Sequence, residues 1–463
     1  MPTVPYQTLL PELTLVAAFL VELWLLALPG RRMGGWVSLV AITVSLFGIC
    51  WRAQGLPAQP FLVPFLSLQL AQWQTPFLAV ADVAALVSVL WLQLARRPAR
   101  YDAGPLSFFL LAALAGAHVL VLAHGPVLSF LALETLSLAS YAAMAWPGRK
   151  PALQATLRYA LLGLFSSACL AYGLSWSYGL SLLPPSNASP QAWYIAQALL
   201  LVGVLFKLGA FPLHGWVPRI YEAAPLPMVA FLSVAPKVAS LGWVSNLAYF
   251  SHTTLPQIAL PLAVVGAASV LAGNVGAFYQ TRFLRLMGFS SVAHAGFMLL
   301  CLACPAPLEV AGFYSLALLG INYMAFGLWG QLQAGGASPE LASVSGWAKG
   351  HTLWAVLAVV SGLALAGLPP TVGFVAKFKL VLGLARQQQV FGPAWAYGLA
   401  AFVALNTAVS LYYYLKLPYH LIFKPAQEQP EPQRRLALVA LLALGAALLF
   451  FFFAAQALEA FVQ

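Results

Sequence analysis

Long apolar runs occupy almost the whole sequence, and this feature most constrains how the chain can fold. A membrane-spanning helix needs about 20 predominantly apolar residues, and a bilayer admits only structures that pair their own backbone groups. The 463 residues are 62% hydrophobic and only 7% charged, which excludes an ordinary soluble domain. Fourteen such stretches are present, at residues 8–28, 34–51, 75–95, 106–123, 126–146, 153–180, 194–215, 227–249, 257–278, 283–303, 308–332, 351–380, 393–418 and 436–459. The sequence therefore predicts an all-α polytopic membrane protein, with residues 52–74 as a loop or short sheet outside the bilayer.

The lysines and arginines gather in alternate loops between these spans. Sixteen of the 22 lie in or beside loops that follow odd-numbered spans, and two or three lie after even-numbered spans. The positive-inside rule then predicts both termini on the periplasmic side of a bacterial inner membrane. The net charge of +11 is thus mainly a topology signal, and no loop is basic and aromatic enough to predict nucleic-acid binding.

A few ionisable residues remain at membrane depth. A charge at the centre of a spanning helix costs roughly 2.5–3.5 kcal/mol on insertion scales, so each needs a reason. The strongest candidates for proton translocation are Glu134, Lys207, Lys237 and Lys377. One interpretation is a structural ion pair between Glu134 and one lysine. The other is a proton relay, because a nearby carboxylate changes how readily a buried lysine holds its proton.

Weaker signals come from other polar residues within the spans. Asp82 has small neighbours and is expected to form a hydrogen bond within the bundle, whereas Glu22 lies toward a span end and is expected to reach the interface. Cys301 and Cys304 form a lone CxxC, for which ordinary apolar packing is favoured over a metal site.

Two histidines lie within predicted spans and are candidates for a polar path. Imidazole handles protons near neutral pH, although a lone membrane histidine is often a packing residue. His294 follows Ser290 and Ser291, so these three residues and His118 complete the set of possible path residues.

Prolines interrupt two of the spans. Pro212 follows Lys207 by five residues, while Pro369 and Pro370 precede Lys377. Proline removes a backbone donor, and such a break is tolerated at membrane depth only inside protein or beside a polar cavity. Because the interrupted spans are the seventh and the twelfth, spans 4–8 and 9–13 are predicted to form two inverted five-helix repeats, as in many transporters.

These repeats divide the sequence into four expected parts. The parts are helices 1–3, the first repeat, the second repeat and helix 14, at residues 1–100, 101–250, 251–425 and 426–463.

Three segments carry a resemblance to a known family. KLGAFPLHGWVPRIYEAAPLPMVAFLSVAPKVAS, GNVGAFYQTRFLRLMGFSSVAHAGFM and LAGLPPTVGFVAKF resemble the proton-translocating antiporter-type family shared by respiratory complex I and Mrp cation/proton antiporters. Within it the chain is most similar to the subunit N branch of bacterial NADH–quinone oxidoreductase, which has a lysine at the position of Lys377. The resemblance runs from about span three to span thirteen.

The resemblance implies roles for the buried residues. Glu134 and Lys207 would form a charge switch, and Lys237, together with His294, would bridge to Lys377 as the exit or entry lysine. It also implies a translocase subunit without a redox centre or cofactor of its own. NADH, FMN, iron–sulfur clusters and quinone would then lie in partner subunits, with other membrane-arm subunits as neighbours.

The sequence departs from the family pattern at helix edges. Arg219 stands where the family has an acid, EAAP replaces a Gly-containing turn, and RFLRL thins a basic pair. These changes put surface and subunit contacts in doubt more than the proton path.

Other functions stay open from the sequence. They are a subunit of a multisubunit sodium/proton antiporter, a non-pumping scaffold of a quinone-dependent complex, and, less favoured, a small-solute permease. The permease is disfavoured because the buried charges are spread over several helices.

Overall fold

The computed structural model describes most of the chain as helix. The described residues are 6–27, 34–55, 61–63, 67–94, 103–182, 190–250, 255–425 and 435–462. They divide into two compact units, one of Met1–Gly209 with Ala223–Gln257 and the other of Ala210–Glu222 with Ile258–Gln463.

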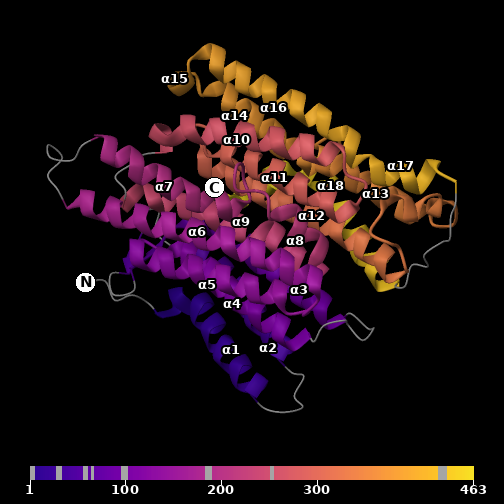
Figure 1. Ribbon diagram of the computed structural model, residues 1–463, viewed down its shortest axis with the longest axis horizontal. Helices are drawn as coiled ribbons and strands as arrows, with labels where there is room; N and C mark the ends of the chain where they lie inside the picture. The colour runs from indigo at the N-terminus through magenta and orange to yellow at the C-terminus, as the bar shows by residue number, and fades with distance from the viewer. Residues whose placement is uncertain are drawn as a thin grey trace. The chain divides into compact units, whose positions relative to one another are not determined.

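The first unit contains eight of the α-helices that the structure describes and one β-hairpin. The helices are α1 (Leu10–Ala27), α2 (Gly34–Gly55), α3 (Thr75–Leu94), α4 (Ala103–Leu122), α5 (Pro126–Ala145), α6 (Lys150–Ser181), α7 (Pro190–Leu208) and α9 (Leu226–Phe250). Strands β1 (Phe61–Val63) and β2 (Leu68–Leu70) pair antiparallel, with Leu62 opposite Gln69. Short 3₁₀ turns, η1 (Tyr6–Leu9) and η3 (Gln72–Gln74), precede α1 and α3. Successive helices pack side by side, as α1 with α2 and α4 with α5 in Figure 1.

The regular elements that the structure describes in the second unit are helices, with one isolated β-bridge between Arg282 and Glu340. Its helices are α8 (Val217–Ala223), α10 (Leu255–Phe278), α11 (Phe283–Cys301), α12 (Pro307–Ala334), α13 (Thr352–Ala366), α14 (Val372–Arg386), α15 (Gln388–Phe391), α16 (Pro393–Tyr414), α17 (Lys416–Phe423), α18 (Arg435–Phe453) and α19 (Ala455–Val462). Two 3₁₀ turns, η4 (Leu341–Val344) and η5 (Trp347–Gly350), lie between α12 and α13. Helices α12, α14 and α16 each pack against α13.

The predicted fold class, an all-α polytopic membrane protein, is confirmed. Each of the fourteen predicted stretches overlaps a helix, and twelve helices among the described residues are long and apolar enough to cross a membrane. The predicted stretches at residues 8–28 and 351–380, the second of which contains Pro369 and Pro370, are not among these twelve. The number of spans therefore stays a prediction. The predicted short sheet within residues 52–74 is present, although α2 runs on to Gly55. Several of the loop arginines, such as Arg31 and Arg97, lie outside the described residues.

The two interrupted helices break with the same local pattern. Helix α7 ends at Leu208 and α13 at Ala366, and each is followed by a glycine with positive φ, 68° at Gly209 and 77° at Gly367. This left-handed conformation at the end of a helix suits glycine, which has no Cβ to clash. Proline follows three residues later in both cases, at Pro212 and Pro370, and both proline peptide bonds are cis.

The matching pattern extends further than the prolines. Residues 209–217 and 367–375 both read Gly-x-x-Pro-x-x-Gly-aromatic-Val, a correspondence that the sequence reasoning missed. In this register Arg219 corresponds to Lys377. The shared pattern supports an internal repeat, while the inverted orientation and the four-part division of the chain stay predictions.

The first interruption also changes which unit the chain belongs to. Residues 210–222, which include all of α8 except Ala223, pack with the second unit. The Phe211 N–H donates to Ser269 Oγ at 3.0 Å, and the Tyr221 hydroxyl lies 2.7 Å from Ser291 Oγ. A Cβ on Gly288 of α11 would lie 2.5 Å from Pro218 Cα, so only glycine permits this close approach of α8.

Candidate functional site

Helices α5, α6 and α7 bring Glu134 and Lys207 into one polar region of the first unit. Lys207, in the last turn of α7, is 2% exposed and donates from Nζ to Ser137 Oγ at 3.0 Å. Ser137 follows Glu134 by three residues on α5, so the two side chains lie one turn apart on the same face. The Glu134 carboxylate accepts a hydrogen bond from the Ser167 hydroxyl of α6. The predicted acid and lysine thus lie in the same region, and each is hydrogen-bonded to a serine hydroxyl.

The interpretation of a structural Glu134–lysine ion pair does not match this arrangement for Lys207. Within the part of the chain that the structure describes, the ion pairs lie elsewhere and none joins Glu134 to Lys207. Ser137 Oγ itself donates to Leu133 O at 2.7 Å, which leaves its lone pairs to accept from Lys207. Sequence reasoning missed both serines; Ser137, one turn from the half-buried Glu134 on α5, was a usable signal, whereas Ser167 of α6 was not.

Lys237 lies in the middle of α9 and is 2% exposed. Its neighbour Pro236 is inside the helix, where it lacks the N–H that would bond one turn back. Ser240 Oγ donates to the Pro236 carbonyl at 2.7 Å. Lys237 is therefore buried at a locally weakened point of α9, a helix that packs against α3 and α4 in the first unit.

Lys377 is held by the second helix interruption. Its Nζ donates to the carbonyls of Ala366 at 2.8 Å and Leu365 at 3.3 Å, at the C-terminal end of α13. These carbonyls lie at the negative end of the helix dipole, which favours a cation. The ammonium also lies 5.0 Å from the ring centroid of Phe297. The break thus supplies the polar groups that solvate this buried lysine.

His294 lies at the centre of a hydroxyl network in the second unit. Its Nδ1 lies 2.7 Å from the Tyr314 hydroxyl and its Nε2 lies 3.3 Å from the Tyr414 hydroxyl. Ser290 Oγ lies 2.6 Å from the same Tyr414 hydroxyl. The Phe297 ring is near both His294, 6.2 Å away by ring centroids, and the Lys377 ammonium, 5.0 Å from its centroid.

The structure brings the predicted Ser290 and His294 together, whereas Ser291 turns to Tyr221 of α8. Tyr314 and Tyr414 were missed, because buried tyrosines also serve as ordinary packing residues. The run Tyr412–Tyr414 was the available signal, since a buried tyrosine hydroxyl usually needs a hydrogen-bond partner.

His118 is not part of either group. Its Nε2 lies 2.8 Å from Asp82 Oδ1, which confirms the expected hydrogen bond of Asp82 within the bundle. The expectation that Glu22 reaches the interface is wrong. Glu22 is fully buried, and its carboxylate accepts hydrogen bonds from the Ser38 N–H at 3.0 Å and the Ser38 hydroxyl. Packing of α2 against α1 closes off the carboxylate, which a single helix cannot reveal.

The CxxC cysteines and the residues at the helix edges are the remaining features singled out in the sequence. Cys301 and Cys304 are free and buried, and the described residues contain no group of metal-ligating side chains.

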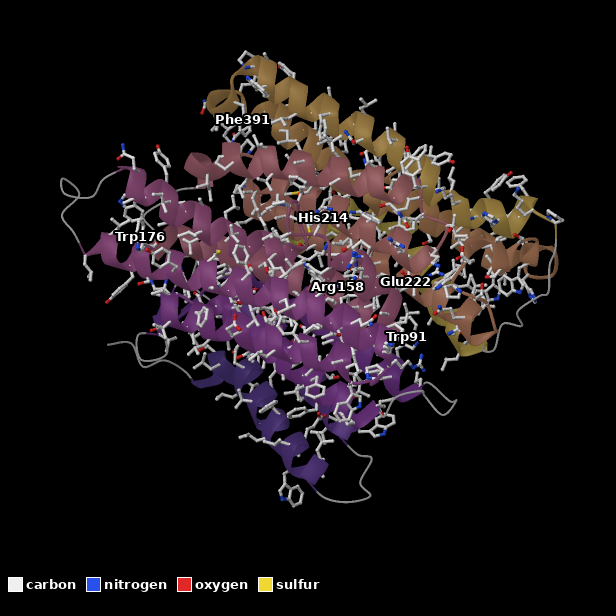
Figure 2. All side chains as sticks on the ribbon, in the orientation of Figure 1. Trp91, Arg158, Trp176, His214, Glu222 and Phe391 are labelled. Carbon is white, nitrogen blue, oxygen red and sulfur yellow. The ribbon has the colours of Figure 1, made fainter. Side chains whose placement is uncertain are left out.

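Arg219 is exposed on α8. His214 lies within the first interruption and Glu222 near the end of α8 (Figure 2). Glu222 and Glu340 both pair with Arg282, the first arginine of RFLRL.

Two interrupted helices, each with a buried lysine at or next to its break, define a class of polytopic membrane proteins built for ion movement. A family model described as "NADH:quinone oxidoreductase/Mrp antiporter, TM" matches residues 125–402. NADH-quinone oxidoreductase subunit N of Halorhodospira halophila is 36% identical over 72% of this chain and 71% of its own. Subunit 14 of the Thermus thermophilus enzyme is 32% identical over 89% of this chain and 95% of its own. The chain therefore belongs to the NADH:quinone oxidoreductase/Mrp antiporter family.

Solved structures agree with this assignment. A chain of respiratory complex I from Thermus thermophilus matches with a TM-score of 0.81 at 28% identity, over 97% of this chain and 98% of that one. A chain of the Mrp complex from Dietzia has a TM-score of 0.86 over 99% and 96%, but at 21% identity it shares the fold alone.

Proposed function

We propose that the chain is a proton-translocating membrane-arm subunit of an NADH–quinone oxidoreductase, similar to subunit N. Relatives that are 36% and 32% identical over 72% and 92% of the chain are named NADH-quinone oxidoreductase subunit N, and complex I supplies a solved structure above 25% identity. The chain would move protons through buried glutamate and lysine residues, coupled to quinone reduction in other subunits.

The observation that carries this proposal is the contact between Lys207 and Ser137. A buried lysine with a permanent carboxylate partner would be a structural ion pair, held in one charge state. Here the acceptor is a neutral hydroxyl, and both an ammonium and an amine can donate to it. Lys207 can therefore bind or release a proton without losing this hydrogen bond.

The neighbouring carboxylate would control that step. Glu134 lies one turn from Ser137, and its charge favours an ammonium on Lys207 when it is close and ionised. Movement of Glu134 or its protonation would then release the Lys207 proton. Lys237 and His294 would pass the proton on, with water between them, to Lys377.

The redox chemistry would belong to other subunits. We expect NADH, FMN, iron–sulfur clusters and quinone to lie in partner subunits, with neighbouring antiporter-like and small hydrophobic subunits against this chain. The alternate-loop distribution of basic residues favours a bacterial inner membrane with both termini on the periplasmic side.

Two measurements test the proposal. The solubilised chain is expected to co-migrate with a large NADH-oxidising assembly, and co-migration with small antiporter subunits alone would favour the Mrp-type alternative. Lys207→Met is expected to lower proton pumping at least several-fold in an assembled complex. Lys424→Met, which removes an exposed lysine, is the matched control. Normal pumping in an assembled Lys207→Met complex would contradict the relay.

A further inference from the structure

The four N-terminal helices bury a charged group that the proposed relay does not use. Helices α1, α2, α3 and α4 each contribute one residue to this N-terminal quartet, namely Glu12, Arg52, Asp82 and His118. Each is at most 9% exposed, and all four belong to the first unit.

The contacts place the imidazole between the two acids. His118 Nε2 lies 2.8 Å from Asp82 Oδ1, and Nδ1 lies 3.7 Å from Glu12 Oε1. The Arg52 guanidinium donates to Glu12 Oε1 at 3.0 Å and to the Thr8 carbonyl at 3.3 Å. Both ring nitrogens of His118 therefore face carboxylate oxygens.

This geometry is suited to an imidazolium. A neutral imidazole has one N–H, so one of its nitrogens would direct a lone pair at a carboxylate. An imidazolium has two N–H groups: one donates to Asp82 at 2.8 Å, and the other directs its positive charge at Glu12 Oε1, which at 3.7 Å is an ion-pair contact and not a hydrogen bond. Glu12 Oε2 and Asp82 Oδ2 have no hydrogen-bond partner within the described residues. The stabilisation of these two buried carboxylates therefore depends more strongly on a positive charge nearby.

The charge balance leads to the same conclusion. With a neutral His118 the quartet holds two carboxylates and one guanidinium, an excess negative charge in a buried site. With an imidazolium the charges cancel, and an uncompensated buried charge is strongly destabilising. The other charged residues on helices packed against α4 are Glu22 of α1, Glu134 of α5 and Lys237 of α9. The carboxylates in contact with His118 are those of Asp82 and Glu12.

We propose that the N-terminal quartet is a second proton-binding site, in which His118 holds a bound proton between Asp82 and Glu12. The bound proton neutralises the quartet and ties the four helices together. The four residues of this site lie on α1, α2, α3 and α4, and none of them belongs to the proposed relay. A test of this site is therefore independent of a test of the relay.

Solid-state nitrogen NMR of the full chain in lipid, labelled with ¹⁵N-histidine, tests the proposal. Ordinary histidines have a pKa of about 6.5 and are neutral at pH 8. At pH 8 we expect a signal set with both ring nitrogens protonated, present in the wild type and in His294→Gln but lost in His118→Gln. A His118 signal with one unprotonated nitrogen at pH 8 would overturn the proposal.

The doubly protonated signal can also be assigned to His118 in the wild type, without a variant that must fold. Among the described residues, the contact between a histidine ring and an aspartate is that of His118 with Asp82, so a short ¹⁵N–¹³C distance from a histidine ring to an aspartate carboxyl carbon also supports the assignment to His118.

Carboxylate variants then test what holds the proton. Asp82→Asn leaves Glu12 and Arg52 balanced, and we expect it to abolish the doubly protonated signal at pH 8. Glu22→Gln removes another buried carboxylate of the same helices, which contacts Ser38, and is expected to leave the signal unchanged. Retention of the signal in Asp82→Asn would also contradict the proposal.

Discussion

Lys377 on α14 donates a 2.8 Å hydrogen bond to the carbonyl of Ala366, at the end of α13, across the second helix interruption. The end of one half-helix thus solvates the lysine of the other half. A broken helix in lipid would leave carbonyls unpaired, and a lysine in an apolar bundle would leave an ammonium unsolvated. Here the carbonyls at the end of α13 accept hydrogen bonds from the Lys377 ammonium, so both sets of polar groups are paired.

Lys377→Met should therefore affect both stability and transport. It leaves the Ala366 and Leu365 carbonyls without this donor, at a cost of about 1–3 kcal/mol for an unsatisfied buried group. We expect a lower thermal midpoint and a several-fold loss of proton pumping, measured on the same reconstituted preparation. Lys377→Arg retains the donor and should recover stability more than pumping. Equal recovery of both would indicate a purely structural role.

Gly367→Ala tests the turn that positions this lysine. Gly367 has φ of 77°, and an added Cβ would lie 2.5 Å from Lys377 Cδ. We expect a loss of at least about 1 kcal/mol of stability, because both backbone strain and the clash oppose the substitution. Gly398→Ala on α16 is the control, since its Cβ would meet open space in a helix and should be neutral or stabilising. Thermal unfolding of both variants measures the difference, and similar midpoints would contradict it.

Ser137→Ala tests the hydroxyl that accepts from Lys207. Loss of this acceptor should lower pumping without preventing assembly, because Lys207 loses its anchor next to Glu134. Ser140→Ala is a matched control: Ser140 is also buried on α5 and donates to its own helix, to Leu136 O at 2.6 Å. Initial pumping rates in proteoliposomes provide the measurement. Equal rates for the two variants would show that the Lys207 contact is dispensable.

The pair formed by Arg282 and Glu340 gives a pH prediction outside the spanning helices. Hydrogen bonding from the Arg282 guanidinium lowers the pKa of the Glu340 carboxyl below its usual range. The contribution to stability is present above the unfolded pKa, about 4.3, and is lost as the pH falls through the lower folded pKa. We expect the wild type to exceed Glu340→Gln slightly in thermal midpoint at pH 7, with the difference vanishing in acid. Because both side chains are exposed, high salt should also reduce the difference. A difference that is independent of pH and salt would exclude this electrostatic origin.

Much of the architecture follows from local features of the sequence. Apolar runs determine where helices form because a bilayer demands internal backbone pairing, and prolines determine where two of them stop. Pro212 and Pro370 could be identified as breaks without any knowledge of neighbouring helices. Lys207, Lys237 and Lys377 could be identified in the same way, because a charge inside an apolar run is costly wherever the run packs.

What those lysines contact was decided by the tertiary structure. Lys207 meets Ser137 across 70 residues of sequence, and His294 meets Tyr414 across 120. The burial of Glu22 was predicted wrongly for the same reason, since burial depends on which helix packs against which. The sequence by itself determined the helices, the breaks and the buried charges, through the local cost of polar groups in lipid. Only the tertiary structure decided their partners, because a hydrogen bond depends on distances between helices that are far apart in the sequence.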